Sequence, residues 1–213
     1  MVIVQSMFSL FSTRVSVSGD FSGLRTEIIR KVIHFLIALA PSMAAINKPF
    51  TVFLLLIGTL SYTFMERMRL SGVNVPIISS ITSMASRRRD AGNFVLGPVT
   101  LGFGALLALL LYPSPVAAIS IYALAFGDGV ASLVGKFFGN WRPAFLFGKS
   151  VEGSIACFAA VFISAYAVSG YVQIALIAAF VATLVEALPL KDYDNLAIPV
   201  TVGISVHFAS MYL

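Results

Sequence analysis

The sequence predicts an all-α membrane protein, a polytopic bundle of about seven transmembrane helices with its N-terminus in the cytoplasm. Three observations support this fold class. Of the 213 residues, 59% are hydrophobic and only 11% are charged, less than half the charged fraction of a soluble domain. The mean hydropathy is +0.96. Finally, the chain contains apolar stretches long enough to cross a bilayer, which takes about 20 residues per helix.

Seven stretches meet this requirement, and the segments around them fix the domain organisation. We expect residues 25–213 to form a single transmembrane domain and residues 1–24 an interfacial arm, because the apolar start lacks a basic segment and a cleavage site. Residues 71–94 contain an apolar piece too short to cross, which we place in the headgroup plane. The predicted spans are 29–46, 50–66, 95–112, 115–135, 153–169, 172–188 and 196–213.

Lysine and arginine are distributed unevenly between the two ends of the predicted spans. With a cytoplasmic N-terminus, only Lys48 of the fourteen Lys and Arg residues falls on the non-cytoplasmic side. A bias of this kind is typical of cytoplasmic loops. The other thirteen are Arg14, Arg25, Arg30, Lys31, Arg67, Arg69, Arg87, Arg88, Arg89, Lys136, Arg142, Lys149 and Lys191.

The acidic residues follow the same side although no sorting rule requires it, since acids contribute little to topology. All nine fall on the cytoplasmic side or in the cytoplasmic half of a span. We therefore expect an active site that faces the cytoplasm. These acids are Asp20, Glu27, Glu66, Asp90, Asp128, Glu152, Glu186, Asp192 and Asp194.

Cysteine content and net charge exclude other classes. The single cysteine, Cys157, lies in an apolar run, which excludes an intrachain disulfide and a cysteine-based zinc site. The net charge of +5 could suggest nucleic acid, but the cations lie at the ends of apolar helices. We therefore expect a lipid bilayer as partner and no nucleic acid.

Asp128 is the most informative acid, because it lies about 12 Å inside the predicted fourth span at 1.5 Å per residue. An ionised carboxylate at that depth costs about 2.5–3.5 kcal/mol and needs a partner or a wet cavity. The helix face that carries Asp128 also carries Ala131, Ser132, Gly135 and Gly139, with Lys136 near its mouth. Two interpretations remain open: a small-residue packing seam, or a groove with an acid at its floor.

The segment Gly148-Lys-Ser-Val-Glu-Gly-Ser154 precedes the fifth predicted span. It is not a Walker loop, because the earlier glycine is replaced by Pro143 and no strand precedes it. Lys149, Ser150 and the amides of a helix N-terminus up to Gly153 and Ser154 still suit a phosphate. The alternative is a plain helix start, with Ser150 as the N-cap.

A third cluster runs from Glu186 to Pro199 and includes Asp194 and Asn195. Asp194 is either a helix cap or part of a site. Together with Asp128 and Glu152, Glu186 and Asp194 would repel one another on one membrane face unless cations intervene. Carboxylate oxygens of this kind suit Mg²⁺ or another divalent cation, which takes one or two carboxylates plus substrate phosphates.

The fourth cluster is Arg30-Lys31-Val-Ile-His34, within about one helical turn at the start of the first span. It is either a membrane anchor with a packed histidine or part of the site. The run Arg87 to Arg89 either contacts headgroups or steers a nucleotide triphosphate. These two alternatives stay open.

The four clusters, in this order, resemble the membrane polyprenol kinase family, which includes dolichol kinase, phytol kinase and the CTP-dependent diacylglycerol kinase. The matching residues span about 30 to 200. They are Arg30-Lys31-x-x-His34, Asp128-x-x-Ala131-x-x-x-Gly135-x-x-x-Gly139, Lys149-Ser150-x-Glu152-Gly153-Ser154 and Glu186-Ala187-Leu188 with Asp194-Asn195-Leu196-x-Ile198-Pro199.

The resemblance implies phosphoryl transfer, usually from CTP, to a membrane lipid alcohol such as a polyprenol, dolichol, phytol or diacylglycerol, with a divalent metal. It makes residues 25–213 a catalytic domain. On the matching positions it implies catalytic Asp128, Glu152 and Asp194, and metal ligands among Asp128, Glu152, Glu186 and Asp194. The nucleotide or phosphate ligands would be Arg30, Lys31, His34, Lys149, Ser150, Gly153, Ser154 and Asn195, to which we add Lys136 because it lies near the mouth of the groove.

Two alternatives to a kinase are open at this point. The residues from Asp128 to Gly153 also look like phosphatidate cytidylyltransferase, which would make a CDP-lipid from CTP, although the ending Asp194-Asn195 fits the kinases better. The other alternative is a cation-binding membrane transporter. A transporter would carry polar groups on both sides of the midplane, whereas the non-cytoplasmic halves here are almost featureless.

Overall fold

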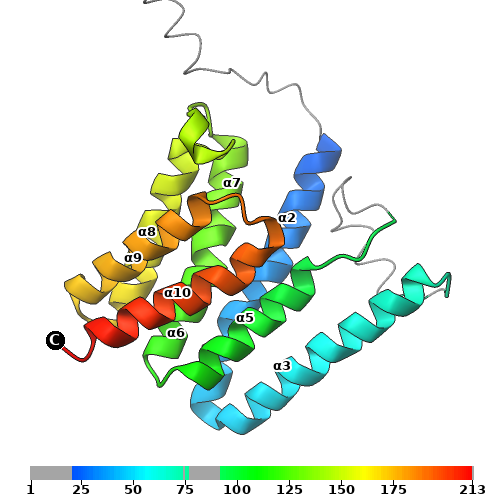
Figure 1. Cartoon of the computed structure of the whole chain (residues 1–213), viewed down its shortest axis with the longest axis horizontal. Coiled ribbons are helices and arrows are strands. Elements are labelled where there is room, and N and C mark those ends of the chain that lie inside the picture. Colours follow the sequence, from blue (N-terminus) through cyan, green and yellow to red (C-terminus); the bar gives the residue numbers. More distant parts are fainter. Residues whose placement is uncertain (1–20, 74, 77–91, 213) are drawn as a thin grey trace, which may run out of the picture.

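Every regular element in the described part of the chain is a helix, which confirms the predicted all-α class. The computed structural model describes residues 21–73, 75–76 and 92–212. Figure 1 shows helices that run back and forth along one bundle. The α-helices are α2 (Phe21–Phe35), α3 (Ala40–Leu70), α5 (Gly97–Leu111), α6 (Val116–Tyr122), α7 (Gly129–Phe137), α8 (Val151–Ser169), α9 (Val172–Ala187) and α10 (Asp194–Ala209).

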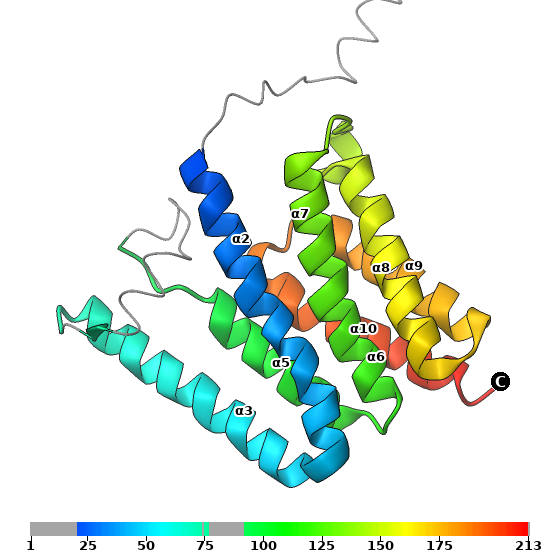
Figure 2. The same cartoon turned by 180° about the vertical axis from the view of Figure 1, so that it is seen from behind.

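Shorter elements join or interrupt these helices. The 3-10 turn η1 (Leu36–Leu39) links α2 to α3, and the π-helical turn η3 (Ala123–Asp128) joins α6 to α7 into one rod. Two further 3-10 turns, η4 (Ala144–Leu146) and η5 (Lys191–Tyr193), precede α8 and α10. They lie in the α7–α8 and α9–α10 connections, which are at the same end of the bundle (Figure 2).

Each of the seven predicted apolar stretches is helical over most of its length. The largest difference is at the first, where α2 begins at Phe21, eight residues before the predicted start at 29. The first two stretches meet at Asn47, whose φ of −151° and ψ of 94° break the helix path inside α3. The side chain of Asn47 accepts a hydrogen bond from the amide of Phe50 at 3.0 Å and so caps the second part of α3. Pro49 lies in the first turn of that part, where a missing N–H costs nothing.

Within the described residues, three helical stretches are long and apolar enough to cross a membrane: Thr26–Leu70, Val116–Phe137 and Val151–Ser169. Gly97–Leu111 and Val172–Ala187 are shorter apolar helices. These lengths and compositions support an integral membrane protein.

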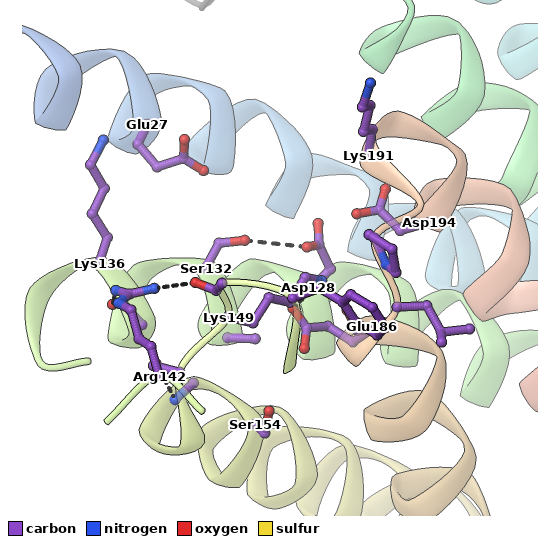
Figure 3. A pocket seen from close by; sticks show the side chains of 18 of the residues that line it. Glu27, Asp128, Ser132, Lys136, Arg142, Lys149, Ser154, Glu186, Lys191 and Asp194 are labelled. Atoms are coloured by element: carbon purple, nitrogen blue, oxygen red, sulfur yellow. Dashed lines mark hydrogen bonds and ion pairs between the residues drawn. The ribbon is translucent and has the colours of Figure 1, made fainter. Parts of the chain in front are cut away.

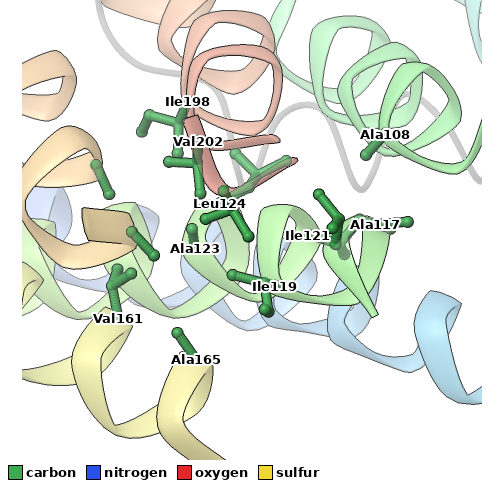
Figure 4. Close-up of a cluster of buried hydrophobic side chains, with 14 of the residues drawn as sticks. Ala108, Ala117, Ile119, Ile121, Ala123, Leu124, Val161, Ala165, Ile198 and Val202 are labelled. Carbon is green, nitrogen blue, oxygen red and sulfur yellow. The ribbon is translucent and has the colours of Figure 1, made fainter. Parts of the chain in front are cut away.

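The rod α6–η3–α7 is the centre of the bundle. Of its most apolar window, 67% is buried, compared with 22% for α8. In Figure 4, Ile119, Ala123 and Leu124 of the rod face Val161 of α8 and Val202 of α10. The rod is thus wrapped by its neighbours, and a polar side chain on it is shielded from lipid.

Small residues allow the helices around the rod to approach closely. Ala175, Ala178, Ala179 and Ala182 lie on one face of α9 and are fully buried. Close packing of small faces is the main source of helix association when the solvent is lipid. In this bundle the small residues place the ends of α7, α8, α9 and α10 next to one another.

Two predictions fall on residues that the structure does not describe. The interfacial arm, 1–24, lies outside the described residues up to position 20. The predicted headgroup-plane segment, 71–94, lies outside them from 77 to 91, which includes the three arginines 87–89.

Candidate active site

A polar pocket of about 440 Å³ lies where α2, α7, α8, α9 and α10 meet at one end of the bundle. Its charged lining residues number four acids and five bases (Figure 3). A mixture of this kind suits an anion that arrives together with a cation. The acids are Glu27, Asp128, Glu186 and Asp194, and the bases are Arg30, Lys136, Arg142, Lys149 and Lys191.

Asp128 lies at the buried end of this pocket. Its Oδ2 accepts a hydrogen bond from Lys31 Nζ, in an ion pair in which Lys31 is 1% exposed and Asp128 4% exposed. Its Oδ1 accepts a hydrogen bond from Ser132 Oγ at 3.2 Å. His34 Nε2 lies 3.4 Å from Oδ2 and donates to the carbonyl of Leu124 at 3.0 Å. The buried acid therefore has the partner that its burial requires.

Local helix geometry places Asp128 in this position. It is the last residue of the π-helical turn η3, and turns of this kind often occur at functional sites. Its neighbour Gly129 leaves room for the ring of Phe35 in α2, which a Cβ would meet. The absence of that Cβ allows α2 to pack against the rod, so that Lys31 and His34 reach the carboxylate.

The N-terminus of α8 forms the opposite wall. Ser150 Oγ accepts a hydrogen bond from the amide of Gly153 at 3.1 Å, the expected N-cap arrangement. A Cβ on Gly153 would come within 2.9 Å of the carbonyl of Ala131, and Gly135 lies against the same turn. Both interpretations of the small-residue face therefore hold: Gly135 packs against α8, while Asp128 and Ser132 line the pocket.

Lys149 connects the α8 wall to α9. Its Nζ lies 2.6 Å from Glu186 Oε1 and also donates to the carbonyl of Glu186. Lys149 is still partly exposed, whereas Glu186 is buried at 4% exposure. The pair anchors the end of α9 and leaves the lysine at the pocket surface.

Asp194 comes from the start of α10 and lies beside Asp128 in Figure 3. It precedes the stretch 196–213 that we expect to span. Burial, together with the negative charge of Asp128, raises the pKa of Asp194 to about 7. The two carboxylates are thus close enough to repel, and a proton or a cation between them relieves that repulsion.

A divalent cation fits this arrangement only with help from a substrate. Among the described residues, no three His, Cys, Asp or Glu side chains form a ready metal site. Asp128 and Asp194 supply two carboxylates in one pocket. That number suits Mg²⁺, which usually takes one or two carboxylates and completes its shell with water and phosphate oxygens.

Two buried polar atoms at the pocket have no hydrogen-bond partner among the described residues. They are Arg30 Nε and Ser154 Oγ, and both residues line the pocket. Arg30 is also paired with Glu27, with 2.5 Å between Nη2 and Oε1. Since buried polar groups are nearly always satisfied, these two atoms indicate where a polar ligand would bind.

Several predicted site residues do not line the pocket. Glu152 accepts the backbone amides of Asn140 and Trp141 at 3.0 and 3.1 Å instead. The side-chain amide of Asn195 donates through Nδ2 to Thr100 Oγ1 at 3.0 Å and ties α10 to α5. Lys31 and His34 lie behind the lining and contact Asp128. Arg30, Asp128, Lys136, Lys149, Ser150, Gly153, Ser154, Glu186 and Asp194 do line it.

The structure adds lining residues that our sequence analysis did not assign to the site: Glu27, Ser132, Arg142 and Lys191. Arg142 donates to the carbonyls of Gly148 and Gly135 at 2.7 and 2.5 Å, and so fastens the loop before α8 to α7. Ser132 was on the predicted groove face, and Glu27 lies four residues before Lys31. Arg142 and Lys191 carried no signal beyond their charge.

Comparisons with known proteins show which proteins the chain is similar to. No family model matches the chain, and no solved structure matches it. It is 26% identical to a probable chloroplastic phytol kinase 1 of Glycine max over 83% of this chain and 65% of that protein. It is also 26% identical to CTP-dependent diacylglycerol kinase 1 of Eremothecium gossypii, over 89% and 68%. Farnesol kinase of Arabidopsis thaliana is 30% identical over 63% and 50%.

The chain is therefore a distant homologue of the phytol and farnesol kinases and of the CTP-dependent diacylglycerol kinase, at about 26% identity over most of its length. These homologues are lipid-alcohol kinases by name. The chain spans about two thirds of the length of the first of these relatives.

Proposed function

We propose that the protein is a CTP-dependent kinase that phosphorylates a membrane lipid alcohol to its monophosphate. The observation that carries this proposal is the single pocket in which Asp128, Glu186 and Asp194 lie among five cationic side chains, at the end of an apolar bundle. Phosphoryl transfer relies on positioning and charge neutralisation more than on covalent help from the protein. This pocket offers both positive and negative side chains next to the apolar surface of the bundle.

The nucleotide phosphates bind the basic wall in this proposal. Lys149, Lys136 and Arg142 supply positive charge, and the positive end of the α8 helix dipole lies at this wall. The unpartnered Ser154 Oγ and Arg30 Nε donate to phosphate oxygens. Arg142 keeps this wall in place through Gly148 and Gly135.

The acids face the other side of the phosphates. Asp128 and Asp194, with Glu186 beside them, would hold a divalent cation such as Mg²⁺, which would neutralise charge on the transferred phosphoryl group. Lys31 keeps the buried Asp128 ionised, and Ser132 orients its second oxygen. Asp128 is then able to accept a proton.

In the reaction the oxygen of the lipid alcohol attacks the terminal phosphorus of CTP. The bond between that phosphorus and the β-γ bridging oxygen breaks, CDP leaves, and the hydroxyl proton goes to a carboxylate. We assign this role to Asp128, because among the acids that line the pocket it lies farthest inside a predicted span. The products are the lipid monophosphate and CDP.

The hydrocarbon chain of the acceptor has an apolar approach to the pocket. An apolar groove of about 370 Å³ lies between α8 and α9 and is lined in part by Phe158 and Phe180. Phe158 follows Ser154 by one helical turn. On α9, Phe180 is followed at one-turn spacing by Leu184, and Leu188, just past the end of α9, lines the polar pocket. In this proposal the groove leads along the two helices to the pocket.

The sidedness of the protein follows from the same proposal. The pocket end carries Arg30, Lys136, Arg142, Lys149 and Lys191, and the positive-inside rule favours this end in the cytoplasm. Seven crossings, with a cytoplasmic N-terminus, bring every pocket residue to that side. Residues 25–213 then form one transmembrane catalytic domain.

A nucleotide and acceptor panel tests this function. Purified protein in detergent micelles is mixed with Mg²⁺ and one γ-³²P-labelled nucleotide, which is CTP, ATP, GTP or UTP. Each nucleotide is combined in turn with phytol, farnesol, a polyprenol or diacylglycerol as the acceptor. We expect label in a lipid monophosphate and release of CDP. Transfer of a cytidylyl group with release of pyrophosphate would make the protein a cytidylyltransferase. No turnover together with cation flux in proteoliposomes would make it a transporter.

Glu152 is expected to act as a positioning residue in the loop before α8. Glu152→Gln keeps an oxygen that can accept from Asn140 and Trp141, so turnover should stay near that of the wild type. Asp194→Asn, in the pocket itself, should lower kcat by at least about 10²-fold. Single-turnover and steady-state assays of the two variants make this comparison. Equal losses would place Glu152 on the metal or the substrate.

A further inference from the structure

We propose that Phe147 is the residue on which the base of the bound nucleotide stacks. This inference rests on the proposed nucleotide-dependent function and deepens it. Phe147 lines the same pocket as Lys149, Arg142 and Ser154, yet its side chain is 62% exposed. The pocket therefore has an open aromatic face next to the cations that we assign to the phosphates.

The backbone of Phe147 is in an unfavourable region. Its φ of 51° and ψ of 36° are left-handed, a conformation that a bulky residue rarely adopts. Phe147 ends the short turn η4, and the next residue, Gly148, has a φ of 89°. Because the ring is exposed, its burial in the core does not offset this strain. Strained conformations of this kind concentrate at binding sites.

The loop that carries Phe147 is held firmly from both sides. Arg142 binds the carbonyl of Gly148, and the amide of Lys149 donates to the carbonyl of Leu146 at 2.9 Å. The amide of Val151 donates to the carbonyl of Trp141 at 2.9 Å. A ring on a fixed loop loses little freedom when a flat ligand stacks on it.

Neighbouring aromatic residues show why Phe147 is distinct. Phe138, Trp141 and Phe145 are also more than half exposed, and aromatic side chains at a helix end are typical of the membrane interface. None of these three belongs to the pocket lining. Phe145 lies two residues away, is 67% exposed and provides a matched control.

The geometry separates the base from the phosphates. Lys149 follows Phe147 by two residues and lies in the α8 wall, to which we assign the phosphates. A nucleotide whose phosphates occupy that wall would place its base over the exposed ring. Stacking on an aromatic ring tolerates any base, so Phe147 raises affinity for nucleotides without choosing among them.

The test compares CTP with inorganic tripolyphosphate, which has the phosphates but no base. Binding of radiolabelled CTP with Mg²⁺ to purified full-length protein is measured by equilibrium dialysis, and tripolyphosphate is measured as a competitor. We expect Phe147→Ala to raise the Kd for CTP about tenfold and to leave the tripolyphosphate affinity unchanged. Phe147→Tyr should bind CTP as the wild type does, and so should Phe145→Ala.

Three outcomes would overturn this inference alone. Unchanged CTP affinity in Phe147→Ala would remove the stacking role but leave the kinase proposal standing. An equal loss of CTP and tripolyphosphate affinity would show that the substitution disturbs the phosphate wall. An equal loss in Phe147→Ala and Phe145→Ala would assign the effect to the aromatic surface as a whole. A wild-type protein that binds none of CTP, ATP, GTP and UTP would instead overturn the proposed function, and the stacking site with it.

Discussion

Replacing Asp128 by asparagine is expected to lower phosphoryl transfer by about 10²–10⁴-fold, the range by which a general acid or base contributes to an enzyme rate. Asparagine keeps the shape of the side chain and can still accept a hydrogen bond from Ser132. It cannot take up the alcohol proton, and it offers no charge to a divalent cation. The measurement is single-turnover transfer from [γ-³²P]CTP to the best acceptor of the panel.

Loss of folding is the competing explanation for an inactive Asp128→Asn protein, and Glu66 offers a matched control. Glu66 is a fully buried acid in α3 with its own cation: Arg69 Nε and Nη2 lie 2.8 and 2.7 Å from its two oxygens. It also accepts the amide of Val95 at 3.0 Å and lies outside the pocket lining. Glu66→Gln should therefore lose stability but keep its kcat.

Two results would contradict the assignment of Asp128. The first is an Asp128→Asn protein that turns over at the wild-type rate. The second is a Glu66→Gln protein that loses as much activity as Asp128→Asn at the same melting temperature in detergent. In the second case the activity would follow stability alone, and Asp128 would need no chemical role.

Much of the fold was predictable because a helix that crosses lipid must be apolar along its whole length. The helices α5, α8 and α9 therefore begin and end close to the predicted boundaries. The order of burial was not predictable. The most apolar 18-residue windows of Val116–Phe137 and Val151–Ser169 are similarly hydrophobic, yet 67% of the first and 22% of the second are buried. In a bilayer, an apolar side chain gains little free energy by facing protein instead of lipid, because both are apolar. Hydropathy therefore does not distinguish a central helix from a peripheral one.

The candidate site also contains some residues that were predictable from the sequence and others that were not. Asp128 and Lys149 were predictable as pocket residues, because charge in or beside an apolar stretch is costly and marks a site. Glu152 and Asn195 were assigned to the site because they match the family motifs, and Glu152 also because it is one of four acids expected on one membrane face. Each bonds to a neighbouring segment instead, Glu152 to the amide of Trp141 and Asn195 to Thr100. Whether a polar side chain at a helix end turns inward depends on which backbone groups the neighbouring segments leave unsatisfied, and that is a property of tertiary packing.

Lys31 is expected to be the most important residue for stability in the site. It is buried, and its ammonium is paired with Asp128 Oδ2. Removing one partner of a buried ion pair leaves an uncompensated charge and costs about 3–5 kcal/mol. Lys31→Met keeps the length of the side chain but not its charge, so it should lower the free energy of unfolding by about that amount. His34, 3.4 Å from the same oxygen, donates to the carbonyl of Leu124 and does not replace the lysine.

The double variant Lys31→Met with Asp128→Asn separates stability from catalysis. With both charges removed, most of the lost stability should return, because a neutral pair leaves no buried charge to solvate. Phosphoryl transfer should stay at the level of Asp128→Asn. The free energies of unfolding of the wild type, both single variants and the double variant, measured by denaturant titration in mixed micelles, form a double-mutant cycle. If the single effects simply add to within about 0.5 kcal/mol, the two side chains do not depend on each other. Lys31 could then not be what keeps Asp128 ionised at the floor of the pocket.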